Sequence, residues 1–145
     1  FIGVKRRMEV ICESQGVTIY DDFAHHPTAI KSTLEGLRAK VGDDFILAII
    51  EPRSATMKMG VHQQTLASSV KSADQVLWYQ NAAIDWDMAS LSDAIEIPSM
   101  IINKLDDLIE AAVNLAHSND ILTSDQPRAC YVFFIIMNRI ARLLC

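Results

Sequence analysis

Cysteine is scarce in this 145-residue chain, and its arrangement argues against the usual cysteine-based sites. Cys12, Cys130 and Cys145 are far apart, and none belongs to a CxxC pair. A disulfide framework and a structural zinc site are therefore both disfavoured. We expect free thiols instead, as in proteins of the reducing cytoplasm.

Long apolar runs are also missing. The longest one, residues 129–137, falls well short of the roughly 18 residues that a membrane-spanning helix needs. The first seven residues lack the basic-then-apolar order of a signal peptide. We therefore expect a cytoplasmic protein with no membrane segment. Because the chain begins with Phe1 rather than Met, we also expect it to be a piece of a longer protein.

Glycine-rich ligand cradles are absent from the sequence. All five glycines lie at or before residue 60, and none forms a GxxxxGK[ST], GxGxxG or GxSxG pattern. Those patterns bind triphosphates, bind dinucleotides and present catalytic serines, respectively. A kinase or dehydrogenase that works through this chain alone is therefore disfavoured.

Positive charge is in short supply, with 13 Lys and Arg against 18 Asp and Glu, a net charge of −5. This balance disfavours nucleic-acid binding by charge alone. The charge is uneven, because residues 126–145 carry three arginines and no acidic residue, which leaves −8 on residues 1–125. Since 50% of the residues are hydrophobic, the chain has enough apolar side chains for the packed core of one domain.

Apolar periodicity predicts alternating strands and helices. Strands are expected at residues 8–12, 17–23, 45–50, 75–79, 99–102 and from 121, and helices at 27–40, 61–72, 88–94 and from 103. The first two strands are joined by a Gly-containing link and should form a hairpin. The continuous apolar run 45–50 suits a strand buried on both faces. This order predicts an α/β domain with a mostly parallel sheet, whose ligands bind at the carboxyl ends of the strands.

Two polar clusters fall at such strand ends, residues 21–27 and residues 51–54. The first contains Asp21, Asp22, His25 and His26, followed by Pro27 at the expected first position of a helix. A helix start offers unpaired N–H groups that suit a phosphate, and the carboxylates suit a ribose, a base edge or an indirectly held Mg²⁺. Ordinary capping of the hairpin and the helix explains the same residues equally well. Without a second pair of histidines nearby, a catalytic metal held by this chain alone is disfavoured.

Weaker signals stand at two other places. Arg53 directly follows the buried strand 45–50, where it could contact a phosphate or carboxylate, or form a surface ion pair with Glu51. Residues 5–7, Lys-Arg-Arg, suit a solvated edge, although strand alternation could turn one of the two arginines toward a ligand. Trp78 is expected in the core, and the loop that follows it, up to Trp86, could shape a specificity pocket.

Two segments are specific enough to indicate a family. Residues 3–9 (GVKRRME) and 17–28 (VTIYDDFAHHPT) resemble the start of the C-terminal domain of the Mur ligases. There, an Arg-Met/aromatic-Glu segment and a hairpin precede Asp-Tyr/Phe-Ala-His-x-Pro. The resemblance is strong to about residue 80 and weaker to about residue 122. Within the family, residues 51–60 most resemble the members that take a murein tripeptide as substrate.

The resemblance implies that this chain is one of the three domains of a cytoplasmic ligase. It implies a Rossmann-like, three-layer domain at residues 1–125 that closes over ATP, next to N-terminal and central domains absent from this chain. ATP with Mg²⁺, bound mainly by the central domain, would activate the carboxylate of UDP-N-acetylmuramate as an acyl phosphate. The amine of L-Ala-γ-D-Glu-meso-diaminopimelate would then attack it, in peptidoglycan recycling. Such catalysis depends mainly on positioning and charge neutralisation.

The resemblance also assigns roles residue by residue. Arg7 matches the family arginine that approaches the phosphates, and Asp22 matches the aspartate that contacts the nucleoside. His25 and His26 match the positions beside the ribose and the helix start. Arg53 and Ser54 match the strand-end loop that faces the phosphates or the peptide. These assignments make Arg7 and Arg53 catalytic candidates and Ser54 a substrate contact.

The end of the chain departs from the family pattern. After residue 123 the family has a glycine-rich loop, whereas residues 123–131 here contain no glycine. We expect residues 126–145 to form an atypical apolar and basic helical tail packed on the domain, with Val132, Ile136 and Ile140 facing the core. Two hypotheses follow: part of an active ligase, or a non-enzymatic α/β binding module, such as the remnant of a disrupted ligase gene. In either case we expect the isolated chain to be inactive.

Overall fold

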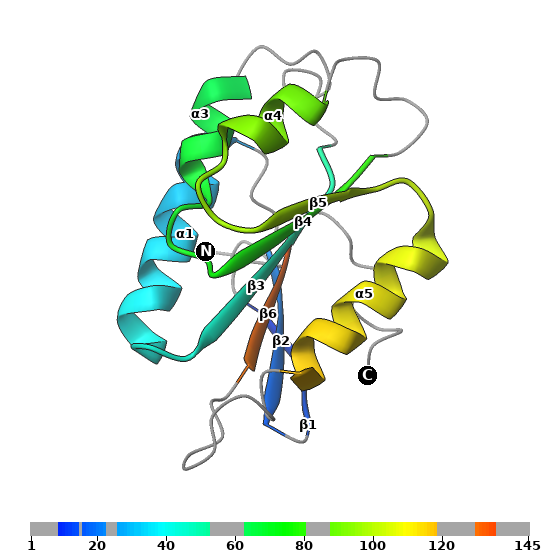
Figure 1. Ribbon diagram of the computed structural model, residues 1–145. Coiled ribbons are helices and arrows are strands. Elements are labelled where there is room, and N and C mark those ends of the chain that lie inside the picture. Colours follow the sequence, from blue (N-terminus) through cyan, green and yellow to red (C-terminus); the bar gives the residue numbers. More distant parts are fainter. Residues whose placement is uncertain are drawn as a thin grey trace, which may run out of the picture.

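The computed structural model describes residues 9–14, 16–22, 26–52, 63–80, 88–118 and 130–135. Strands and helices alternate along most of the chain (Figure 1). The strands are β1 (Glu9–Ser14), β2 (Val17–Asp22), β3 (Phe45–Ile50), β4 (Gln75–Tyr79), β5 (Ser99–Ile102) and β6 (Cys130–Ile135). The helices are α1 (Pro27–Val41), α3 (Gln63–Ser69), α4 (Met88–Ala94) and α5 (Leu105–Ser118).

The strands form one six-stranded sheet in the order β1-β2-β6-β3-β4-β5. Only the β1–β2 hairpin is antiparallel, and every other neighbouring pair is parallel. Helices α1, α3 and α4 cover one face of the sheet, and α5 lies on the other (Figure 1). The expected three-layer α/β domain with a mostly parallel sheet and an N-terminal hairpin is therefore confirmed.

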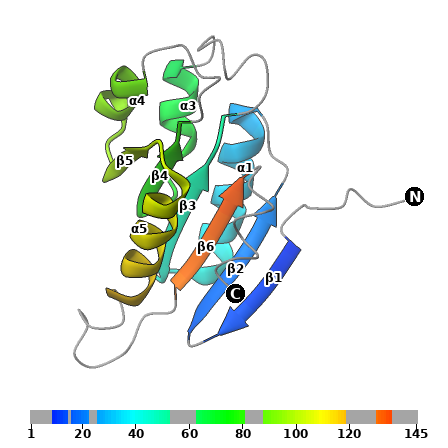
Figure 2. The same ribbon diagram turned by 90° about the vertical axis from the view of Figure 1, so that its right-hand side faces the viewer.

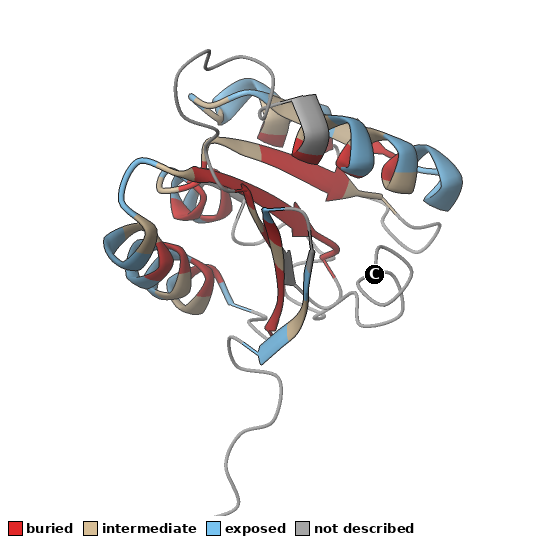
Figure 3. Ribbon diagram, turned by 90° about the horizontal axis from the view of Figure 1, so that it is seen from below, coloured by how far each residue is buried: buried red, intermediate tan, exposed pale blue. Residues whose placement is uncertain are grey.

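The core consists of two apolar layers, one on each face of the sheet. All six residues of β3 are buried, so side chains that alternate along this strand feed both layers. On one face, the layer includes Ile30 and Leu34 of α1. On the other face, it includes Leu108 and Ala112 of α5. Figure 3 shows this arrangement, with buried residues on the central strands and on the sides of the helices that face them.

Helix α1 runs from the carboxyl end of β2 back to the amino end of β3. His26 caps its start and Pro27 occupies the first turn, as the sequence predicted. At its other end, Gly42 has a φ of 66° and donates its N–H to the Arg38 carbonyl oxygen over 3.0 Å. A residue with a Cβ rarely adopts that φ, so the glycine allows the chain to leave the helix and enter β3.

The amino end of the sheet is fixed by Arg38 of α1. Its Nη2 donates to Asp74 Oδ2 at 2.7 Å, and its Nε donates to the Ser72 carbonyl at 3.0 Å. Its Nη1 donates to the carbonyls of Gly42 and Asp44, each at 2.8 Å. This one side chain therefore joins the end of α1 to the segments that enter β3 and β4.

Residues 130–135 correct one expectation. We expected a helix throughout residues 126–145, but Cys130–Ile135 form β6, between β2 and β3 at the centre of the sheet. The segment is apolar on both faces of a strand and rich in aromatic and β-branched residues, a composition that suits a central strand. Val132 does face the core, with 2% of its surface exposed. Ile136, Ile140 and the strand expected from residue 121 lie outside the described residues.

The cysteines correct a second expectation. Cys130 is buried and belongs to no disulfide, as expected. Cys12 is disulfide-bonded, although three free thiols were expected. Its partner lies outside the described residues. Among the described helices, none has both the length and the apolar content to cross a bilayer.

Candidate functional site

The carboxyl ends of β2 and β3 meet at one edge of the sheet, where the sequence placed its two polar clusters. In the strand register, Asp22 of β2 is level with Ile135 of β6, and Ile135 is level with Ile50 of β3. Glu51 follows Ile50 directly. The two clusters therefore lie at the same edge of the sheet, on either side of β6, as expected for parallel strands.

Asp22 is a buried carboxylate, with 3% of its surface exposed. Tyr20, two residues earlier in β2, packs in the layer beneath α1, so strand alternation places Asp22 on that side too. Asp21 is equally buried, at 2% exposed, and alternation places it on the α5 side. Burying a carboxylate is costly unless it is hydrogen-bonded or paired, so carboxylates buried at a strand end mark a polar site rather than ordinary core.

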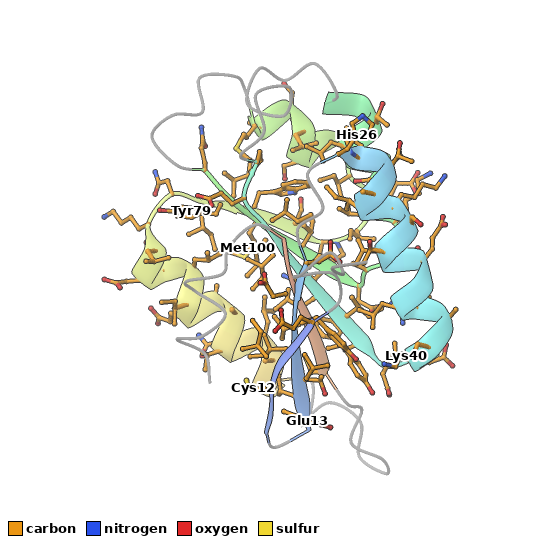
Figure 4. All side chains as sticks on the ribbon, turned by 180° about the vertical axis from the view of Figure 1, so that it is seen from behind. Cys12, Glu13, His26, Lys40, Tyr79 and Met100 are labelled. Carbon is orange, nitrogen blue, oxygen red and sulfur yellow. The ribbon has the colours of Figure 1, made fainter. Side chains whose placement is uncertain are left out.

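His26 is exposed and caps α1. Its Nδ1 accepts a hydrogen bond from the Thr28 backbone N–H at 3.2 Å, so the capping interpretation is confirmed for this residue. No acidic side chain occupies the first turn of α1. Figure 4 shows His26 and Lys40 at opposite ends of α1. The end at His26 is the one that follows Asp22 in the chain. The start of α1 therefore offers backbone N–H groups and a positive dipole end close in sequence to a buried carboxylate.

The burial of Glu51 is a feature of this edge that sequence reasoning missed. The sequence suggested a surface ion pair with Arg53, but Glu51 is only 6% exposed and Pro52 beside it is also buried. The available signal was its position directly after a strand buried on both faces. A charged residue there is covered by neighbouring segments that the local sequence does not reveal.

The structure describes two of the six residues predicted for the site, Asp22 and His26. Arg7, His25, Arg53 and Ser54 lie outside the described residues, as does the loop between Trp78 and Trp86. Within the described part of the chain, no group of three His, Cys, Asp or Glu residues could hold a metal ion. Asp22 and the start of α1 are close together in the chain, and the described residues around them form no group that could hold a metal ion.

Trp78 belongs to the core, as expected, and is fully buried. A cavity of about 460 Å³ lies among Arg38, Lys71, Asp74 and their neighbours. Those residues surround the amino ends of β3 and β4, the opposite end of the sheet from Asp22. The cavity is therefore separate from the candidate site.

Comparisons with known proteins show the family of the chain. Residues 6–123 match the family model described as "Mur ligase, glutamate ligase domain". A relative from Escherichia coli K12, UDP-N-acetylmuramate–L-alanyl-γ-D-glutamyl-meso-2,6-diaminoheptandioate ligase, is 46% identical over 121 residues, 83% of this chain and 26% of its own. The chain therefore spans about a quarter of the length of that curated relative.

Several solved structures are also similar to this chain. A murein peptide ligase from Psychrobacter arcticus superposes with a TM-score of 0.75 at 36% identity, over 99% of this chain and 30% of that one. A single domain assigned to a tripeptide ligase of Haemophilus ducreyi superposes with a TM-score of 0.72 at 31% identity. The superposition covers 95% of this chain and 96% of that one. A folylpolyglutamate synthase from Mycobacterium tuberculosis in complex with ADP, 14% identical with a TM-score of 0.69, shares the fold.

Proposed function

The chain belongs to the Mur ligase family as its glutamate ligase domain, and we propose that it is the C-terminal, nucleotide-closing part of a cytoplasmic murein tripeptide ligase. In this proposal, the longer protein joins L-Ala-γ-D-Glu-meso-diaminopimelate to UDP-N-acetylmuramate at the expense of ATP. The peptidoglycan fragment would thereby be recycled.

The choice of the tripeptide rests on how far the similarity extends. The E. coli relative that takes the tripeptide is 46% identical over 83% of this chain. A UDP-N-acetylmuramate–L-alanine ligase from Desulfitobacterium hafniense is 44% identical, but over 53% of the chain. The longer match is the observation that carries the proposal, because it includes elements beyond those shared with the alanine ligase.

Within this domain, the proposed work is binding and positioning. The buried Asp22 carboxylate would accept hydrogen bonds from the nucleoside, and the N–H groups at the start of α1, which His26 caps, would face the anionic part of the ligand. Arg7 and Arg53 would neutralise phosphate charge, and Ser54 would contact the substrate. ATP supplies the phosphoryl group that activates the muramate carboxylate, and Mg²⁺ would be held mainly by the central domain. Fixing these groups before reaction is how such a site lowers the barrier.

Asp22→Asn in the full-length protein tests the nucleotide role. The isosteric amide keeps the shape but removes the charge that strengthens hydrogen bonds, worth about 1.5–3 kcal/mol, so kcat/KM for ATP should fall about 10- to 100-fold. Steady-state phosphate release at varied ATP measures this. The matched control is Asp93→Asn on the exposed side of α4, which should behave as wild type. An Asp22→Asn enzyme with unchanged kcat/KM for ATP would contradict the assignment.

A non-enzymatic module remains the second candidate, favoured by one observation. The family match ends at residue 123, and the residues that follow lack the glycines of the family pattern. Sequencing the genomic locus separates the two. An in-frame upstream Gly-x-x-Gly-Lys-Thr segment within a central domain supports the ligase, and its absence supports the module.

A further inference from the structure

The surface cavity at the amino end of the sheet has no part in the proposed reaction. Its volume is about 460 Å³, within the range of roughly 300–1,000 Å³ that small-molecule sites occupy. Figure 2 views the sheet from the α5 side, with α1 and α3 behind it. The cavity lies on that far side, where α1 and α3 end and where β3 and β4 begin. The residues that line it include Arg38, Asp43, Lys71, Asp74 and Ile97.

The charged walls of this cavity are held in place by hydrogen bonds within the protein. Four of the five N–H groups of the Arg38 guanidinium donate to the segments that enter β3 and β4. Asp74 is bonded twice to Ile46 of β3. Its backbone N–H donates to the Ile46 carbonyl at 2.9 Å, and its Oδ2 accepts from the Ile46 N–H at 2.8 Å. Charged groups that are already fixed lose less conformational freedom when a ligand binds.

Three of these charged side chains keep unused bonding capacity among the described residues. One N–H of Arg38 Nη2 has no partner there, because Nε and Nη1 donate elsewhere and Nη2 makes a single bond. The side chain of Asp74 accepts its two hydrogen bonds through Oδ2 and is 34% exposed, which leaves Oδ1 as an acceptor. Lys71 is exposed and forms no ion pair with the described residues. A ligand can therefore meet donors and an acceptor in one cavity.

The charges around the cavity select the class of ligand. Arg38 and Lys71 disfavour a simple cation, while Asp43 and Asp74 disfavour a simple anion such as phosphate. A zwitterion satisfies both signs, because its carboxylate can meet the two cations while its ammonium meets Asp74. Ile97 is partly buried and offers a contact to an apolar side chain on the same ligand.

We propose that this cavity binds a small zwitterion with an apolar side chain, such as a free amino acid. The ligand carboxylate would accept from Lys71 Nζ and from the remaining Nη2 N–H of Arg38, and the ammonium would donate to Asp74 Oδ1. The nucleotide is proposed to bind at the carboxyl ends of the strands, at the other end of the sheet. This inference is therefore independent of the proposed ligase activity.

Leucine and two of its fragments test the ligand class. L-leucine, added to the ¹⁵N-labelled 145-residue chain, should shift the amide signals of Ala73, Asp74 and Ile97 saturably. Isocaproate lacks the ammonium and isoamylamine lacks the carboxylate. Each should bind at least about fivefold more weakly, because it loses charge-assisted contacts to partly exposed groups. The absence of a saturable shift at these residues would overturn the proposal, as would equal binding of leucine and either fragment.

Lys71→Ala separates binding from folding. Because Lys71 is exposed and forms no ion pair with the described residues, the variant should fold normally but bind leucine at least about fivefold more weakly. Lys104→Ala, at an exposed lysine just before α5, is the matched control and should bind leucine as wild type does. Thermal unfolding gives a second readout, because a ligand that binds only the folded state raises the midpoint. Equal leucine affinity in the two variants would contradict the proposed site.

Discussion

At the scale of single residues, the site depends on charged side chains placed where strands end. The positions of Asp22 at a strand end and of His26 at a helix start could be predicted from the sequence, because the Asp-Phe-Ala-His-His-Pro segment joins the two elements. The burial of Glu51 could not be predicted, because it depends on neighbouring strands rather than on the residues beside it. Local sequence thus indicates which polar residues follow a strand, and tertiary packing decides which of them are buried.

Tyr131 of β6 gives a pH-dependent prediction at this scale. Burial, reinforced by the Asp44 carboxylate, raises the pKa of Tyr131 above its usual value of 10.0. Between the pKa of Tyr131 in the unfolded chain and its higher pKa in the folded protein, the folded state binds more protons than the unfolded state. The contribution of Tyr131 to the free energy of unfolding is therefore fully present below about pH 10 and is lost as the pH rises further. The urea midpoint should therefore decrease from pH 9 to pH 11.

Tyr131→Phe is the matching variant. Phenylalanine keeps the ring that stacks on Tyr20 at 6.2 Å but cannot ionise, so the decrease in the urea midpoint above pH 10 should become smaller. Absorbance at 295 nm should also lose the upward-shifted titration of the Tyr131 phenol. A midpoint that falls equally steeply in both proteins would exclude Tyr131 as the source.

At the scale of elements, most strands and helices follow from local pattern and β6 does not. Strands at residues 45–50, 75–79 and 99–102 and the helix at 88–94 were predicted with the bounds that the structure has. Residues 130–135 were expected to be helical as part of an apolar and basic tail over residues 126–145. These residues form a strand because they pair with β2 on one side and β3 on the other, and this pairing exists only in the assembled sheet.

Val132→Ala tests whether β6 is an integral central strand. Removing two buried methyl groups should lower the free energy of unfolding by about 2 kcal/mol. Val113→Ala is the same change on α5 at a side chain that is 39% exposed, and should change stability by less than about 0.5 kcal/mol. Urea denaturation measures both. Comparable losses would mean that Val132 is not packed at the centre of the sheet.

Asp74 tests the connection between α1 and the strands at the other end of the domain. Its Oδ2 accepts from Arg38 Nη2 at 2.7 Å and from the Ile46 N–H at 2.8 Å. Asp74→Ala should cost about 2 kcal/mol of stability, discounted for the partial exposure of the ion pair. Lys71→Ala, an exposed residue lining the same cavity, should cost less than about 0.5 kcal/mol. Equal thermal midpoints for the two variants would show that the Arg38 contacts do not hold this end together.

At the scale of the whole molecule, the proposed function makes this domain one edge of a larger site. The chain spans about a quarter of the E. coli relative, and its described residues contain no metal-binding cluster. In the proposal, other domains of a longer protein would bind the metal ion and complete the site for the nucleotide and both substrates. We therefore expect the 145-residue chain alone to release no phosphate from ATP.

The most direct test of the account is ligation by the full-length protein. It would be incubated with ATP, Mg²⁺ and UDP-N-acetylmuramate, together with either L-Ala-γ-D-Glu-meso-diaminopimelate or L-alanine, and the products would be identified by mass spectrometry. We predict the UDP-N-acetylmuramoyl tripeptide, ADP and phosphate in equal amounts, with at least about tenfold higher kcat/KM for the tripeptide than for L-alanine. Preference for L-alanine, or no ligation by a folded full-length protein that binds ATP, would contradict the proposal.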